Sequence, residues 1–311
     1  MDPKSKLLLS MVISTLLVVL SEGLILLVIA SILKVPVLFM IPALLVFWLI
    51  QYLISPYLVG RNSLEVSPGG QYGWLYNLVA EIALRSGVKP PRVFLVDSPY
   101  PNAFAFGNSL TGRRVGITVP LLEILNREEL VAVIAHEIGH IKHKDVEIGM
   151  TLGLIPTALG YISTLLLNLG FFTILLAADE VEFLAALLLM ALGTVLFIVT
   201  FTLQIFVLWF NRLRESYADY HSFSLLGEGS EALLTALAKI EIYMQKVRLD
   251  PFTGIIVTAA PVKVEEEDPY LLVKEWLRKK VSVFTDILST HPHPARRAQM
   301  IETLLEGGDR G

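Results

Sequence analysis

The sequence contains no cysteine in its 311 residues. This absence excludes disulfide bonds, a thiol nucleophile and cysteine-ligated zinc. Any metal site in the chain must therefore use histidine and carboxylate side chains as ligands.

Charged residues are also scarce, at 17% of the chain, and the formal net charge is only -4. The chain has no basic excess, so nucleic acid is not expected as a partner. The glycine-containing segments Ser67–Gly70 and Gly227–Ser230 lack the Lys and Ser/Thr ending of a phosphate-binding loop. We interpret both segments as turns.

Long apolar runs, by contrast, are abundant. Hydrophobic residues make up 54% of the chain and the mean hydropathy is +0.64, which is too apolar for an ordinary soluble domain. Four runs are each long enough to cross a bilayer, at residues 7–33, 35–58, 148–178 and 183–210. We expect an integral membrane protein whose four spans form two hairpins, with the lipid bilayer as its surroundings.

The basic residues near the span ends predict the orientation. Lys4 and Lys6 precede the first span, and further basic residues follow the second, precede the third and follow the fourth, namely Arg61, Lys142, Lys144, Arg212 and Arg214. The loop inside the second hairpin carries only acidic residues. The positive-inside rule therefore places both termini and the segments 61–147 and 211–311 in the cytoplasm of a multi-pass cell-membrane protein.

The run His136-Glu137-Ile138-Gly139-His140 carries the chemistry. On a helix, two histidines four residues apart lie about 6 Å apart along the axis, so both imidazoles can reach one zinc ion. Glu137 can then face a water molecule on the metal. The pattern is typical of zinc peptidases, in which the glutamate is the general base.

The surrounding sequence predicts an α+β domain. Asn126 and Glu129 form a capping-box pattern that predicts a helix carrying the two histidines. Short runs at 93–96, 103–106 and 115–119 predict a small sheet, and 74–84, 212–226 and 230–247 predict helices. Residues 250–267 read as a loop.

A basic segment, Lys274–Lys280, contains Trp276. Such a segment can lie on a membrane surface or form an ordinary solvated helix face. We favour the solvated face for it.

Zinc in a catalytic site takes three protein ligands, so a third ligand must be found. His143 lies about 10 Å along the axis from His136, too far to share an ion in an unbroken helix. Glu215 is the better candidate, because Asp219 lies on the same helical face and can accept the free N–H of a ligating histidine. The alternative is that both acids pair with Arg212 or Arg214 on a solvated helix. His221 and His293 are expected to be structural or exposed.

Four blocks in this order resemble the M48 family of membrane zinc metallopeptidases. They are Asn102-Ala103-Phe104-Ala105, the HExxH run, Glu215-x-x-x-Asp219, and Thr290-His291-Pro292 with Arg297 six positions beyond His291. Together with the spans they cover nearly the whole chain. The span count resembles the HtpX-type heat-shock proteases of this family rather than its seven-span CAAX prenyl proteases.

The resemblance implies a gluzincin-like zincin fold and a role for each matching residue. His136, His140 and Glu215 would bind one Zn²⁺, Glu137 would be the catalytic base, and Asp219 would orient a ligand. Asn102, Ala103, Phe104 and Ala105 would form the edge strand that binds an extended substrate. His291 and Arg297 would stabilise the oxyanion and hold the carboxy-terminal segment, in a division that the sequence leaves open.

We therefore expect a zinc metalloendopeptidase that acts in membrane-protein quality control, cutting membrane or misfolded polypeptides at the cytoplasmic face. Residues 1–60 and 148–210 would be the transmembrane hairpins. Residues 61–147 would carry the sheet and the HExxH helix, and 211–311 the third ligand. Two alternatives stay open, a CAAX-type prenyl-peptide protease and a non-catalytic zinc-binding membrane scaffold.

Overall fold

The computed structural model describes residues 3–34, 36–246 and 267–308. Two compact units are distinguished. The sheet-containing unit comprises Met1–Met11, Gln51–Ile148 and Asn211–Gly311, and the apolar unit comprises Val12–Ile50 and Gly149–Phe210. Residues 250–266 of the predicted loop lie outside the described part of the chain.

In the described part of the chain, four helices are long and apolar enough to cross a membrane. They are α1 (Pro3–Leu33), α2 (Val37–Val59), α7 (Leu154–Leu176) and α8 (Glu180–Leu226). The predicted combination of four membrane-spanning helices with a mostly helical α+β domain is therefore confirmed. The helix predicted at 212–226 is the continuation of the fourth span.

The third apolar run forms two helices instead of one. Helix α6 (Asp145–Leu152) ends one residue before Gly153, and α7 begins one residue after it. Pro156, in the first turn of α7, has no N–H to donate to the carbonyl of Leu152, so a continuous hydrogen-bond ladder cannot form there. The run predicted as one element from 148 to 178 is interrupted for this reason.

The sheet has four strands in the order β1-β2-β4-β3. Their bounds are β1 (Ser63–Glu65), β2 (Arg92–Val96), β3 (Ala103–Asn108) and β4 (Gly112–Thr118). Strands β2 and β4 are parallel, whereas β1–β2 and β3–β4 are antiparallel. The three-residue β1 was not predicted, because it is too short to show an alternating pattern. Strand β3 lies at one edge of the sheet.

The hairpin between β3 and β4 depends on Gly107. Its φ is 81°, and a Cβ atom there would lie 2.2 Å from the carbonyl oxygen of Gly112, so no larger residue fits. The carboxamide oxygen of Asn108 accepts hydrogen bonds from the backbone N–H groups of Leu110 at 3.0 Å and Thr111 at 2.8 Å. These bonds fix the turn and with it the position of the edge strand.

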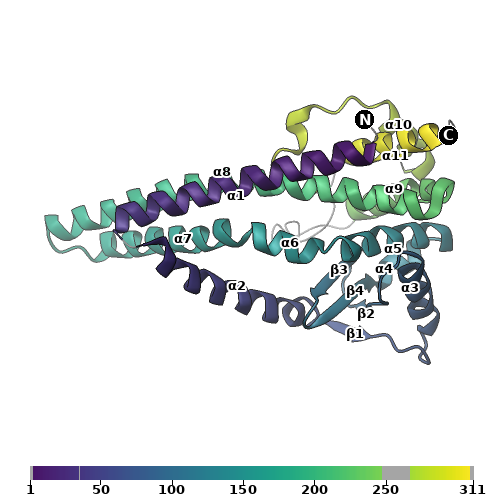
Figure 1. Ribbon diagram of the computed structural model, residues 1–311, viewed down its shortest axis with the longest axis horizontal. Coiled ribbons are helices and arrows are strands. Elements are labelled where there is room, and N and C mark those ends of the chain that lie inside the picture. The colour runs from purple at the N-terminus through teal and green to yellow at the C-terminus, as the bar shows by residue number, and fades with distance from the viewer. Residues whose placement is uncertain (1–2, 35, 247–266, 309–311) are drawn as a thin grey trace. The chain divides into compact units, whose positions relative to one another are not determined.

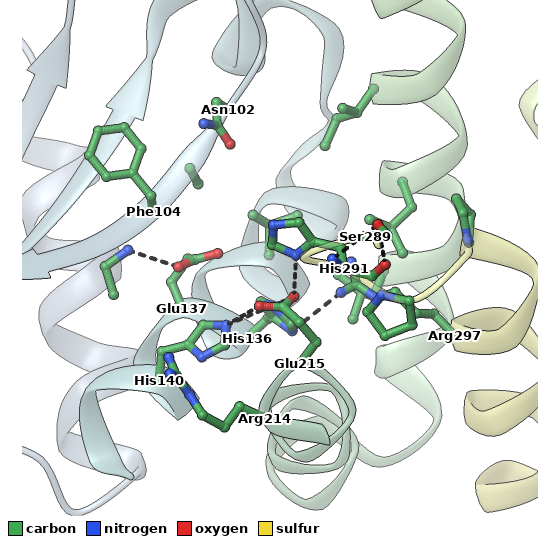
Figure 2. A pocket seen from close by; sticks show the side chains of 18 of the residues that line it. Asn102, Phe104, His136, Glu137, His140, Arg214, Glu215, Ser289, His291 and Arg297 are labelled. Carbon is green, nitrogen blue, oxygen red and sulfur yellow. Dashed lines mark hydrogen bonds and ion pairs between the residues drawn. The ribbon is translucent and has the colours of Figure 1, made fainter. Parts of the chain in front are cut away.

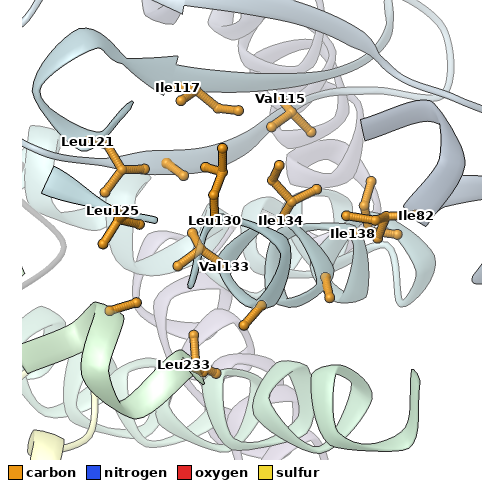
Figure 3. Packing of buried hydrophobic residues seen from close by; sticks show 14 of the residues in the cluster. Ile82, Val115, Ile117, Leu121, Leu125, Leu130, Val133, Ile134, Ile138 and Leu233 are labelled. Atoms are coloured by element: carbon orange, nitrogen blue, oxygen red, sulfur yellow. The ribbon is translucent and has the colours of Figure 1, made fainter. Parts of the chain in front are cut away.

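Helix α5 (Arg127–Lys142) packs on the sheet through an apolar face. Its capping box is present, since Asn126 accepts from the Glu129 N–H at 2.9 Å and Glu129 accepts from the Asn126 N–H at 2.8 Å. Figure 3 shows its buried side chains in a core shared with β4, α9 and α3, namely Leu130, Val133, Ile134 and Ile138. Burying each such side chain contributes about 1.5–3 kcal/mol, so the core fixes how α5 lies on the sheet.

The remaining elements complete the sheet-containing unit (Figure 1). They are α3 (Gly73–Arg85), α4 (Val119–Ile124), η1 (Gly227–Glu231), α9 (Ala232–Lys246), α10 (Pro269–Arg278), η3 (Val283–Asp286) and α11 (Pro294–Gly308). Trp276 of α10 is buried in the same apolar core as α3, α5 and α9. The only tryptophan of the Lys274–Lys280 segment is therefore a core residue.

Candidate metal centre

Polar side chains from several elements of the sheet-containing unit line one cavity of about 400 Å³. Helix α5 supplies the HExxH side chains, α8 supplies Glu215, and α11 supplies Arg297. The segment before α11 supplies His291, and the edge strand β3 forms one wall. Figure 2 shows these residues around the cavity.

Two imidazoles and one carboxylate converge. The Nε2 atoms of His136 and His140 lie 3.2 Å apart. The carboxylate of Glu215 lies 3.6 Å from His136 Nε2 and 3.4 Å from His140 Nε2. Glu215 therefore stands beside the two histidines and not on a solvated helix face with Arg212 or Arg214.

Asp219 and Arg297 support His136 from behind. The Nδ1 atom of His136 lies 2.8 Å from a carboxylate oxygen of Asp219. Arg297 donates to both oxygens of the same carboxylate, with Nε–Oδ2 and Nη2–Oδ1 distances of 2.8 and 2.6 Å. All three side chains are buried. The bidentate pair holds Asp219, and Asp219 fixes the ring orientation of His136.

Asp145 has the corresponding position beside His140, which the sequence did not predict. Its carboxylate lies 2.6 Å from His140 Nδ1. A second contact joins Asp145 to Arg214 Nε at 3.4 Å. The signal that could have found Asp145 is its position, because it begins the helix that follows α5 and is buried, as an acceptor for a ligating histidine should be.

Helices α5 and α8 meet at Gly139, between the two histidines of the motif. A Cβ atom at this position would lie 3.1 Å from the Cβ of His221 and 3.3 Å from the Cα of Ala218. Glycine therefore permits the close approach that brings Glu215 and Asp219 to the imidazoles. No sequence pattern indicates this requirement.

Glu137 faces the edge strand. Its carboxylate accepts a hydrogen bond from the backbone N–H of Ala105 at 2.9 Å. Alternate backbone groups of an edge strand point away from the sheet, so this contact places Glu137 at the free edge of β3. Asn102, Ala103, Phe104 and Ala105 all line the cavity.

The acidic groups of the centre have pKa values shifted in opposite directions. Burial raises the pKa of Glu137 above its ordinary value. Burial also acts to raise the pKa of Glu215, but the neighbouring His291 and His140 outweigh it and hold that pKa well below its usual range. Glu215 is thus held as an anion, as a metal ligand must be, whereas Glu137 has the raised pKa of a general base.

His136 and Asp219 also have shifted pKa values. Burial lowers the pKa of His136, but its hydrogen bond to Asp219, the charge of Asp219 and its hydrogen bond to Glu215 raise it to about 10. For Asp219, burial is opposed by Arg297 and His136, and its pKa falls to about 2. The surroundings of His136 therefore favour a positive charge.

The other histidines are placed as follows. His291 Nδ1 lies 3.1 Å from a carboxylate oxygen of Glu215, at the rim of the cavity. The ring of His143 packs on Tyr217, with centroids 4.3 Å apart. His221 Nε2 lies 3.1 Å from Ser86 Oγ, and His293 Nδ1 accepts from the Ala295 N–H at 3.0 Å, where it caps α11. His221 and His293 therefore have structural contacts.

The donor set fits a metal ion. When His136 and His140 donate their Nδ1–H groups to Asp219 and Asp145 and carry no second proton, their Nε2 lone pairs face each other and Glu215. Three acceptors facing one another at these distances repel unless a cation lies among them. His136, Glu137 and His140 also offer atoms within 4.8 Å of one another.

Comparisons with known proteins show the family to which the chain belongs. The model of the family described as Peptidase family M48 matches residues 70–305. The chain is 68% identical over 310 residues to a Saccharolobus solfataricus protein named Protease HtpX homolog 1, covering 99% of this chain and 100% of the relative. A protein of the same name from Sulfurisphaera tokodaii is 59% identical, covering 98% of this chain and 99% of the relative.

A solved structure shares the fold. The crystal structure of S. mikatae Ste24p matches with a TM-score of 0.54 at 16% identity, covering 96% of this chain and 67% of the other. The family resemblance predicted from the four sequence blocks is confirmed by the family model and the relatives. The chain belongs to peptidase family M48 and is a multi-pass membrane metalloprotease of the HtpX type.

Proposed function

We propose that the protein is a zinc-dependent endopeptidase that cuts membrane or misfolded proteins at the cytoplasmic face, in membrane-protein quality control. The observation that carries the proposal is the position of Glu137. Its carboxylate stands between the Ala105 N–H of an edge strand and the converging side chains of His136, His140 and Glu215.

His136, His140 and Glu215 would hold the zinc ion. Two imidazole nitrogens and one carboxylate oxygen are a donor set that zinc uses in catalytic sites. When bound, zinc supplies a Lewis acid that polarises a carbonyl and lowers the pKa of water. Asp219, Asp145 and Arg297 keep the ligands oriented.

Glu137 acts as the base in this proposal. Its raised pKa and its place at the strand edge suit a group that takes a proton from the attacking water and passes it to the leaving nitrogen. His291, beside Glu215 at the cavity rim, is positioned to stabilise the oxyanion. Arg297 is a positioning residue, because its contacts are with Asp219.

The substrate is an extended polypeptide. A segment lying antiparallel to β3 at its free edge would pass Glu137, since Ala105 donates its N–H there. Only an unfolded or loosely folded segment can add a strand in this way. The cavity wall also includes apolar side chains, namely Phe104, Val133, Leu233, Leu237 and Ile240. These features favour misfolded chains as substrates.

The position of Glu215 on α8 would place the proposed cleavage close to the membrane surface. Glu215 follows the last apolar residue of the fourth span, Phe210, by five positions in the single helix α8, which is about 8 Å at helical rise. The basic residues Arg212 and Arg214 in this stretch favour the cytoplasmic side. Peptide bonds near that surface are therefore the expected sites of cleavage.

Cleavage of casein by the full-length protein, purified in detergent with one equivalent of zinc, tests the proposal. Wild type should cut, whereas Glu137→Gln should retain zinc and not cut. Metal content is measured on both proteins. If both bind zinc and neither cuts casein, the general endopeptidase is contradicted. Cleavage of a farnesylated peptide would then identify a prenyl-peptide protease, and no cleavage of either would indicate the scaffold.

A further inference from the structure

Three apolar side chains are exposed within five residues of the sheet-containing unit, beside the lining residues Thr285 and Asp286 of the cavity. Phe284 is 76% exposed, Leu288 60% and Ile287 39%. They lie between α10 and α11, and we call residues 284–288 the rim segment. A single exposed apolar side chain is ordinary on a protein surface, but a contiguous cluster marks a contact site.

The rim segment is ordered by polar contacts on its inner side. Asp286 is buried and pairs with Arg296 at 2.8 Å. Arg296 also donates to the carbonyl oxygen of Ser282 at 2.6 Å. The backbone N–H of Ser289 donates to the carbonyl of Asp286 at 2.9 Å. With the polar side chain directed inward, the apolar side chains are held outward.

Arg212 ties the rim segment to helix α8. Its guanidinium donates to the carbonyl oxygens of Ser289 at 2.8 Å and Ile287 at 3.3 Å. Arg212 comes two residues after Phe210, the end of the apolar run, in one uninterrupted helix. At 1.5 Å per residue this is about 3 Å along the axis. The rim segment is therefore bonded to the membrane helix where its apolar run ends.

The residues before the rim segment are basic. Arg278, Lys279 and Lys280 precede it within six positions, and Arg278 and Lys280 are exposed. Basic residues next to exposed apolar ones are typical of segments that lie at a bilayer surface carrying anionic lipids. Since Trp276 is buried in the core, the apolar part of such a contact is supplied by the rim segment and not by α10.

We propose that Phe284, Ile287 and Leu288 insert into the interfacial layer of the bilayer that α8 crosses, with Arg278 and Lys280 against anionic headgroups. The lipid contact would also affect the position of residues that line the cavity. Ser289, which follows the rim segment, donates its hydroxyl to the His291 carbonyl at 2.7 Å, and His291 lies against Glu215. Lipid contact would thus hold the cavity rim in place. The proposal depends on neither the metal nor the substrate.

The absence of cysteine permits a direct test, because any cysteine introduced is unique. The full-length variants Phe284→Cys and Leu288→Cys are labelled with bimane and placed in nanodiscs of phosphatidylcholine and phosphatidylglycerol. Quenching is measured with nitroxide-labelled lipid and with aqueous iodide. Circular dichroism and thermal unfolding verify that each labelled variant is folded.

Leu84→Cys is the matched control. Leu84 is 66% exposed, and its neighbour Arg85 bonds to the carbonyl of Leu225 at 3.3 Å. Leu225 lies 15 positions beyond Phe210 on the same helix, about 22 Å along the axis. Position 84 should therefore be reached by iodide and not by the lipid nitroxide.

Lipid quenching at positions 284 and 288 should exceed that at position 84 by about threefold or more, with the order reversed for iodide. Equal iodide quenching at all three positions would overturn the proposal. Protection from both quenchers together with energy transfer between labelled copies would also overturn it, because the segment would then contact a second copy of the chain.

Discussion

The guanidinium of Arg297 binds both carboxylate oxygens of Asp219, and the same carboxylate lies 2.8 Å from His136 Nδ1. A residue near the carboxy terminus therefore controls the orientation of a ligand on α5 through an intermediate on α8. The three groups form one buried network. Removing Arg297 would leave a buried carboxylate without its counter-charge, which is a costly state.

Arg297→Lys should weaken metal binding about 10-fold to 100-fold, because a lysine cannot donate to both oxygens of Asp219. The affinity can be measured by competition with a chromophoric chelator. Arg92→Lys is the control, since Arg92 pairs with Glu65 in a half-exposed ion pair on the sheet. Exposed pairs contribute little, so the control should bind metal like wild type. Equal affinity in both variants would contradict the positioning role.

Asp145→Ala should have a similar effect through His140. Without an acceptor 2.6 Å from Nδ1, the ring of His140 loses both its orientation and its tautomer. We expect a loss of metal affinity of about 10-fold to 100-fold, with activity partly restored by excess metal. Glu147→Ala is the neighbouring control, because Glu147 pairs with Arg113 at 3.6 Å. A decrease in the control as large as in Asp145→Ala would indicate a general effect on α6.

Local sequence signals were sufficient for the helix that carries the motif. Asn126 and Glu129 form the capping box that their spacing predicts, and α5 begins at Arg127. Glu215 and Asp219 could be paired with the histidines because an i,i+4 spacing places both on one helical face. Predictions of this kind depend on contacts within one element.

Tertiary contacts account for what the sequence could not predict. Asp145 reaches His140 across a turn in which Lys144 adopts a φ of 57°, outside any helical spacing rule. The Arg297–Asp219 pair joins residues 78 positions apart. The division of roles that we propose for His291 and Arg297, which the sequence left open, rests on such contacts, since His291 lies against Glu215 and Arg297 binds Asp219.

Gly139→Val should separate α5 from α8. The added side chain would meet His221 and Ala218, where even a Cβ atom comes within 3.1–3.3 Å. We expect a destabilisation of about 1–3 kcal/mol and a loss of metal affinity, because Glu215 moves with α8. Thermal unfolding and metal titration measure the two effects.

Gly307→Ala is the control for the glycine at position 139. Gly307 also lies in a helix, but nothing lies within 4 Å of a Cβ atom built there. Alanine should stabilise this position by up to about 1 kcal/mol through helix propensity. If Gly139→Val leaves both stability and metal binding unchanged, the close approach of α5 to α8 at Gly139 does not determine the position of Glu215.

The stability of the sheet-containing unit should decrease in acid through His221. Burial is the main cause that lowers its pKa to about 4, with Lys142 and His143 acting in the same direction. An unfolded histidine has a pKa near 6.5, so below this pH the unfolded chain binds a proton that the folded chain does not. The contribution of His221 to stability is therefore fully present above pH 6.5 and is lost as the pH falls toward 4.

His221→Gln removes this titration while its amide can still reach Ser86 Oγ, which lies 3.1 Å from His221 Nε2. Because part of the side chain is near solvent, we expect wild type to lose about 1–2 kcal/mol more than the variant between pH 7 and pH 4.5. Thermal unfolding in detergent at both pH values measures the difference. If wild type and His221→Gln lose the same stability between the two pH values, the burial of His221 does not oppose its protonation, and the prediction is wrong.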